Sequence, residues 1–172
     1  FPEYVWKYDF QNNNLGVGGG RNRGFFLSSS KFVYFLDDDA VISDSSTDSF
    51  FLDALALFDA DDRVATITTR IYDEMLGYDR GVVKSSIESL DHVPNILMYL
   101  GGSHFIRKSY FEDPLYLDIK YGMEELLPSL YAIDRGYRNC YLDHLILIHQ
   151  PQINKWVANS EQFRQVVINE IG

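Results

Sequence analysis

The sequence is poor in cysteine and has no long apolar run, and both absences limit what the protein can be. Its single cysteine, Cys140, excludes an intramolecular disulfide framework and favours a reducing compartment. No apolar stretch approaches the roughly 20 residues needed to span a bilayer. Residues 1–4 lack the basic segment and cleavage site of a signal peptide. They also lack an initiator methionine, so we expect a processed or partial chain.

Positive charge is also scarce. The chain has 25 acidic residues against 15 lysines and arginines, which gives a formal net charge of -10. Nucleic acid is therefore excluded as the main partner, because phosphate backbones are bound by clusters of lysine and arginine. The length of 172 residues, with 46% hydrophobic residues, is enough for one core. We expect a single globular domain over residues 1–172.

Strand-like and helix-like segments alternate along the chain, which is typical of an α/β sandwich. The run 31–36 (KFVYFL) is almost continuously apolar, as expected for a central parallel strand buried on both faces. Other expected strands cover residues 4–10, 64–71, 95–107 and 137–149, and expected helices cover 24–30, 47–60, 126–135 and 160–171. We therefore predict a three-layer α/β sandwich around a mixed, mainly parallel central sheet.

Three aspartates, Asp37, Asp38 and Asp39, follow the apolar run directly. Ligands bind at the carboxyl ends of strands in such sheets, and Mg²⁺ and Mn²⁺ prefer carboxylate oxygens that they share with substrate phosphates. The spacing of Asp37 and Asp39 suits one cation, because residues two apart in an extended segment point the same way. A solvated turn that caps the next helix explains the aspartates equally well.

A glycine-rich segment precedes these aspartates. Five glycines lie between Gly16 and Gly24, where backbone could approach a ligand closely. It is not a phosphate-binding P-loop, because no G-K-[ST] follows. It is not a good dinucleotide fingerprint either, since the expected strand before it ends well before the glycines. Taken alone, the segment predicts a turn more strongly than a binding site.

A series of short motifs occurs in an order that resembles the family-2 glycosyltransferases, which have the GT-A fold. The motifs are Asn14-Leu15-Gly16, Gly19-Gly20-Arg21-Asn22-Arg23-Gly24, the strand ending in Asp37-Asp38-Asp39, Gly101-Gly102 through Arg107-Lys108, Tyr121 to Glu125, Asp134 to Arg138, and the strand Leu145 to His149. The resemblance covers roughly residues 4–150. The family's opening strand and helix, expected before Tyr4, are absent from this sequence, so the resemblance implies an incomplete base pocket.

The resemblance implies roles on the donor side. Asp37 is expected to contact the ribose or the metal, and Asp39 to bind the cation that bridges the donor diphosphate. Arg21 matches a family position that helps hold the nucleotide, with Gly20 beside it. A surface arginine, or a salt bridge to the acidic cluster, explains Arg21 equally well. Asp38 is counted with the nucleotide-side residues, although a structural role suits this middle residue better.

On the acceptor side, the resemblance implies a general base near residue 125. Glu125 stands where the family usually has aspartate, and in inverting members this carboxylate removes the proton from the acceptor hydroxyl. The adjacent Glu124 stays open as the alternative base, and both acids could merely stabilise the start of a helix. His149 ends an apolar strand where members often have a third metal ligand, or it is a hydrogen-bonded surface residue. His144 is a weaker candidate.

The resemblance implies a metal-dependent enzyme, with Mn²⁺ or Mg²⁺ as cofactor. It would transfer a sugar from a nucleotide-sugar, most often a UDP-sugar, to a glycan or lipid-linked hydroxyl, with inversion at the anomeric carbon as in inverting members of the family. Residues 1–72 would bind the donor, residues 73–150 the acceptor, and residues 151–172 would form a helical tail. We expect a cytoplasmic protein, with association at the inner membrane face as in bacterial relatives. The alternative is a catalytically silent domain that binds a nucleotide-sugar or a partner.

Overall fold

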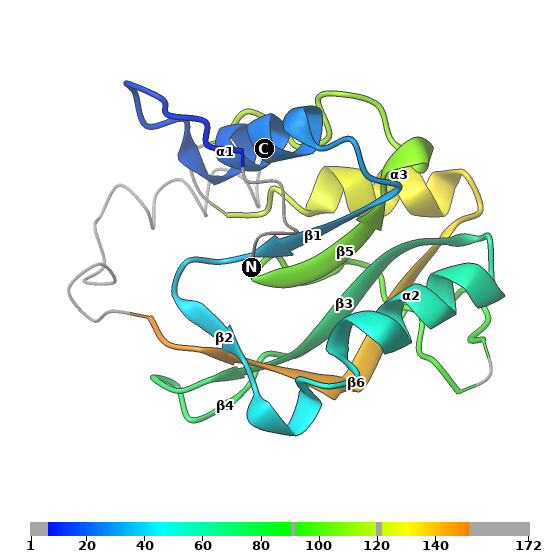
Figure 1. Ribbon diagram of the computed structural model, residues 1–172. Helices are drawn as coiled ribbons and strands as arrows, with labels where there is room; N and C mark the ends of the chain where they lie inside the picture. The colour runs from blue at the N-terminus through cyan, green and yellow to red at the C-terminus, as the bar shows by residue number, and fades with distance from the viewer. Residues whose placement is uncertain (1–6, 91, 120–121, 152–172) are drawn as a thin grey trace.

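A computed structural model of the chain describes residues 7–90, 92–119 and 122–151. The described part contains a six-stranded sheet with helices over both faces (Figure 1). The helices are α1 (Gly16–Leu27), α2 (Phe50–Ala60) and α3 (Leu126–Asp134), with short 3-10 turns at Asp44–Ser46 and Lys108–Tyr110. The strands are β1 (Phe32–Leu36), β2 (Ala40–Ile42), β3 (Val64–Asp73), β4 (Tyr78–Asp79), β5 (Ser103–Arg107) and β6 (Arg138–His149).

The core has two parts, one on each face of the sheet. Successive residues of a strand point to opposite faces. Ala65 and Ile106 accordingly pack in the cluster that includes α1 and α3, while Val64 and Phe105 pack in the cluster that includes α2. These core residues are 0–2% exposed. The arrangement confirms the predicted three-layer α/β sandwich.

The sheet is mixed, as expected, but it is not mainly parallel among the described strands. Its order is β1-β5-β3-β6-β2, with β4 paired to β3. Among the strands that the structure describes, β3 and β6 are the one parallel pair, and the other pairs are antiparallel. The reason is the place of β5, which lies between β1 and β3 and runs opposite to both. The strands β1, β3 and β6 nevertheless run in one direction.

The expectation of a fully buried central strand at 31–36 was wrong. Within the described residues, β1 lies at the end of the sheet with β5 as its one neighbour, and its residues are half-buried or exposed. Its apolar run is explained by aromatic packing on both faces. Phe32 stacks on Phe58 with ring centroids 4.4 Å apart, and Phe35 stacks on His104 at 5.0 Å.

The glycine-rich segment is a helix rather than a turn. It begins at Gly16, whose amide donates a hydrogen bond to the side-chain oxygen of Asn14 at 2.8 Å. Gly18 is needed for packing, since a Cβ there would collide with the backbone carbonyl of Leu117. Helix propensity alone disfavours so many glycines, and this tertiary contact explains the difference from the prediction. Of the expected helix at 24–30, residues 24–27 are the C-terminal part of α1 and residues 28–30 are not helical.

Two consecutive basic residues, the last residue of β5 and the one after it, cap the C-termini of two helices. Arg107 is 3% exposed and donates hydrogen bonds to the carbonyl of Phe58 at 2.5 Å and that of Asp61 at 3.2 Å, at the end of α2. Lys108 donates to the carbonyl of Phe25 at 2.6 Å, near the end of α1. Cations are favourable at helix C-termini, where carbonyls lack partners. This pair fixes both helices to the same strand.

Other boundaries follow the sequence with local differences. Gly136 has φ 75° and ends α3, as its position predicted. The expected strand 95–107 is a strand only from Ser103, because a turn at residues 101–102 interrupts it. Residues 7–10 form no strand, and the rest of the expected strand 4–10 and the expected helix 160–171 lie outside the described residues. None of the described helices is long and apolar enough to cross a bilayer.

Candidate active site

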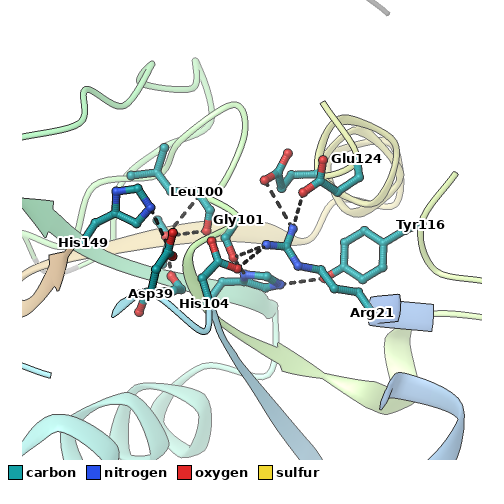
Figure 2. Close-up of polar contacts among 12 residues, drawn as sticks. Arg21, Asp39, Leu100, Gly101, His104, Tyr116, Glu124 and His149 are labelled. Atoms are coloured by element: carbon teal, nitrogen blue, oxygen red, sulfur yellow. Dashed lines mark hydrogen bonds and ion pairs between the residues drawn. The ribbon is translucent and has the colours of Figure 1, made fainter. Parts of the chain in front are cut away.

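The predicted site residues meet in a cleft of about 290 Å³ at the carboxyl ends of β1 and β6. All of the named candidates except Gly20 and His144 line it: Arg21, Asp37, Asp38, Asp39, Glu124, Glu125 and His149. Figure 2 shows His149 and Asp39 at one end and Glu124 at the other, with Arg21 and Gly101 between them. We refer to these as the histidine end and the glutamate end of the cleft.

Asp37, Asp39 and His149 form the histidine end. The chain turns after β1 and enters β2 at Ala40, which pairs with His149 of β6. The Nε2 of His149 lies 3.4 Å from Oδ1 of Asp39. One ligand atom from each of the three residues lies within 4.8 Å of the other two. Two carboxylate oxygens and an imidazole nitrogen suit Mn²⁺, and the carboxylates suit Mg²⁺.

Asp73 and Arg80 also reach this end, and the sequence reading missed both. Asp73 ends β3 and is paired in register with His149 of β6. Its Oδ2 lies 2.9 Å from the Nδ1 of His149 and 3.1 Å from Nη2 of Arg80. Burial opposes its ionisation, but hydrogen bonds from Leu76, Arg80 and His149 hold the pKa of Asp73 below its ordinary value. Asp73 follows the predicted strand 64–71 as Asp37 follows the run 31–36, and this position was the signal in the sequence that could have identified it.

Arg21 pairs with the acidic residues at both ends of the cleft. It donates to Oδ1 of Asp37 at 2.8 Å and to the carbonyl of Gly101 at 2.9 Å. Its other nitrogen forms a short contact with Glu124 and lies 3.5 Å from Glu125. The Arg21 side chain is only 10% exposed. Arg21 is therefore not a surface arginine, and it is salt-bridged to the acidic cluster.

Glu124 and Glu125 lie side by side at the start of α3. Glu124 is 4% exposed, and its Oε2 has no hydrogen-bond partner among the described residues. Burial first, and the charge of Glu124 second, raise the pKa of Glu125 to about 7 against the opposing effect of Arg21. A carboxyl group with a pKa near neutrality can exchange a proton with a hydroxyl group placed beside it.

Two glycines allow the charged side chains to approach the backbone. A Cβ on Gly101 would collide with the carboxylate of Glu125 and lie 2.7 Å from Nη1 of Arg21. A Cβ on Gly102 would lie 3.2 Å from Oδ2 of Asp37. The predicted strand with a glycine break is therefore a tight turn that makes room for the site.

Two residues named as candidates lie elsewhere. Gly20 is exposed on α1 and lines a separate groove, so the structure does not bring it to the cleft with Arg21. His144 is exposed and lies 3.0 Å from Asp53 of α2. Neither residue belongs to the group of possible metal ligands found in the described part of the chain.

Comparisons with known proteins bear on the family and on the fold. A family model described as "Glycosyl transferase family 2" matches residues 3–113. A search of curated proteins finds no match. Among solved structures, A197 from STIV has a TM-score of 0.55 at 17% identity, with 83% of this chain and 70% of that chain covered. GalNAc-T7, solved with UDP, GalNAc and Mn²⁺, has a TM-score of 0.66 at 14% identity, with 92% of this chain and 35% of that chain covered. At these identities the two structures show the fold alone.

Proposed function

The chain belongs to glycosyl transferase family 2 and has the GT-A type of fold, and from this premise we propose that it transfers a sugar from a nucleotide-sugar to an acceptor hydroxyl with a divalent cation. The observation that carries the proposal is the grouping of Asp37, Asp39 and His149 at one end of the cleft. UDP is the first donor nucleotide to test, since GalNAc-T7 was solved with UDP and Mn²⁺.

The residues at the histidine end fit a bound Mn²⁺ or Mg²⁺. Asp37 and Asp39 supply carboxylate oxygens, and Nε2 of His149 faces Asp39 while its Nδ1 is held by Asp73. When bound, the cation supplies charge neutralisation of the leaving diphosphate. The positions of these side chains at the histidine end are fixed by the backbone, because β1, β2 and β6 are paired within the sheet.

Glu125 is our choice of general base for an inverting transfer. The acceptor oxygen forms the bond to the anomeric carbon, while the bond from that carbon to the diphosphate oxygen breaks and its electron pair leaves with the diphosphate. The acceptor proton passes to the Glu125 carboxylate, whose pKa is raised to about 7. Glu124 is the alternative base, but its Oε1 is engaged by Arg21. We assign it to holding Arg21.

The division into a donor part and an acceptor part is a proposal that needs one refinement. Residues 1–72 supply Arg21, Asp37 and Asp39, as expected for the donor part. Residues 73–150 supply Glu125 for the acceptor and also His149 for the donor. The cleft therefore requires both parts of the chain, and neither part alone would hold the cation.

The test is a calorimetric titration of UDP, GDP and dTDP, each with and without Mn²⁺. We expect one nucleotide to bind only with Mn²⁺, and Asp39→Ala to abolish that binding. Asp53→Ala is the matched control, because Asp53 lies on α2 beside the exposed His144, and it should bind like the wild type.

A second assay separates an enzyme from a silent binding domain. Release of the nucleotide from the matching nucleotide-sugar should be measurable and should be lost in Asp39→Ala. Metal-dependent binding without any turnover, in the presence of simple sugar acceptors or water, would favour the silent domain. Absence of nucleotide binding under all conditions would contradict the proposed function.

A further inference from the structure

We propose that Asp73 is a positioning residue, which holds His149 in the tautomer that turns the free lone pair of Nε2 toward Asp37 and Asp39. The inference rests on the proposed function, because it concerns how His149 is prepared to bind a cation. It adds a residue that the sequence motifs do not include. Asp73 contacts Nδ1 of the imidazole ring, whereas Asp39, one of the proposed metal ligands, lies near Nε2.

The backbone places Asp73 and His149 together independently of side-chain details. β3 and β6 are parallel, and Asp73 is in register with His149. On the other side of β6, Ala40 of β2 pairs with the same histidine. The imidazole therefore lies between two carboxylates, that of Asp73 at the end of β3 and that of Asp39 in the turn before β2.

The two oxygens of Asp73 have different partners, and this difference fixes the carboxylate. Oδ1 accepts hydrogen bonds from the backbone amides of Met75 at 3.1 Å and Leu76 at 3.0 Å. Oδ2 faces Nδ1 of His149 at 2.9 Å and Arg80 at 3.1 Å. Because Asp73 is 1% exposed, water does not compete for these positions. The carboxylate is a rigid acceptor aimed at Nδ1.

The donor and acceptor chemistry selects one tautomer. An ionised carboxylate only accepts hydrogen bonds, so its close approach to Nδ1 requires a hydrogen on that nitrogen. A neutral imidazole then has its lone pair on Nε2, the nitrogen that faces Asp39. Arg80 lies 3.1 Å from Nδ1 but can only donate. It is therefore a partner of the Asp73 oxygen rather than of Nδ1 in this tautomer.

The opposite tautomer would prevent cation binding at His149. If Arg80 donated to Nδ1, the hydrogen would be on Nε2 and would point at Asp39. Asp73 and Arg80 thus favour different tautomers of the same ring, and the carboxylate prevails because a lone pair on Nδ1 would face its oxygen at 2.9 Å. Loss of such a partner typically weakens metal binding by about 10- to 100-fold.

Asp73→Asn tests the inference directly. The amides of Met75 and Leu76 require an oxygen at the Oδ1 position, so the amide nitrogen of the new side chain must face His149. It would donate to Nδ1 and force the hydrogen onto Nε2. Asp79→Asn is the matched control, because Asp79 pairs with Arg70 on the exposed neighbouring strand. Arg80→Gln removes the salt bridge to Asp73 but leaves its carboxylate in place.

Two measurements decide the outcome. Nitrogen-15 NMR of the metal-free protein should show the hydrogen of His149 on Nδ1 in the wild type, Asp79→Asn and Arg80→Gln, and on Nε2 in Asp73→Asn. Calorimetric titration with Mn²⁺ alone should show about 10- to 100-fold weaker binding in Asp73→Asn and no weakening in the other two variants. The tautomer readout separates positioning from a simple loss of negative charge, which would weaken Mn²⁺ binding without moving the hydrogen.

The inference is overturned if the wild type carries the hydrogen on Nε2, or if Asp73→Asn folds and binds Mn²⁺ as tightly as the wild type. The wild-type spectrum decides the point even if Asp73→Asn does not fold. Failure of the wild type to bind Mn²⁺ is a different result. It would contradict the proposed function, while the NMR measurement would still show whether Asp73 sets the tautomer.

Discussion

Glu125→Gln should make the protein more stable at neutral and alkaline pH while it removes the transfer activity. Glu125 is buried beside Glu124, so its ionised form is disfavoured in the folded protein. Glutamine keeps the volume and one side-chain oxygen but carries no charge. A general base contributes typically about 10²- to 10⁴-fold to the rate, and we expect a loss of activity in that range.

The pKa of Glu125 sets the size and direction of the stability effect. Its pKa is about 7 in the folded protein against an ordinary value of 4.5. Each tenfold change in proton affinity corresponds to about 1.4 kcal/mol, so ionisation of Glu125 costs the folded state about 3 kcal/mol. Because this pKa is raised, the folded state binds more protons than the unfolded chain between these values. Stability is therefore lost as the pH rises from 4.5 to about 7.

Thermal and urea unfolding of the wild type and Glu125→Gln across this pH range would measure the effect. The two proteins should have similar stability near pH 4.5, and the variant should gain up to about 3 kcal/mol above pH 7. For a chain of this size that gain raises the melting temperature by about 6–12 °C. Glu124→Gln is the control with the opposite sign, because it breaks the buried contact with Arg21 and should destabilise the protein.

A pH-independent difference between the wild type and Glu125→Gln would refute the reasoning. It would mean that Glu125 titrates normally in the folded protein, and its choice as the base would lose its physical support. Activity retained in Glu125→Gln but lost in Glu124→Gln would instead identify Glu124 as the base.

Two further predictions concern the framework of the site. Arg107→Met should lower the free energy of unfolding, measured with urea, by about 3 kcal/mol, because hydrogen bonds to charged groups contribute about 1.5–3 kcal/mol. It should leave the Mn²⁺ affinity unchanged, since Arg107 does not line the cleft. Gly101→Ala should displace Glu125, lower the free energy of unfolding by about 1–3 kcal/mol and reduce the activity. Gly20→Ala is its control, because a Cβ there meets nothing within 4 Å; it should stabilise the protein by about 0.5–1 kcal/mol without changing activity.

The sequence was most informative where strands end. Asp37, Asp39 and His149 could each be placed at the end of an apolar run, and parallel strands bring their carboxyl ends to one edge. Glu124 and Glu125 could be placed at a helix start because Pro128 and Gly136 bound that helix. These positions depend on local patterns and short motifs, which is why the structure brings the residues into one cleft as expected.

Contacts between distant segments could not be predicted in the same way. The helical state of residues 16–24 depends on a loop around Leu117, which approaches a face that only glycine leaves open. The role of Asp73 depends on the pairing of β3 with β6, and the residues after it had no clear pattern. The direction of β5 depends on its place between β1 and β3. Local propensity could not predict these three features, because each is determined by tertiary packing.

The charge of the cleft links these features to the order in which ligands bind. Five carboxylates and two arginines, Arg21 and Arg80, line it. Arg21 is already paired with Asp37 and the two glutamates, and Arg80 with Asp73. An anionic donor would therefore meet uncompensated negative charge at Asp38 and Asp39. A divalent cation held by Asp37, Asp39 and His149 would neutralise the charge there, so the diphosphate should bind after the cation or together with it.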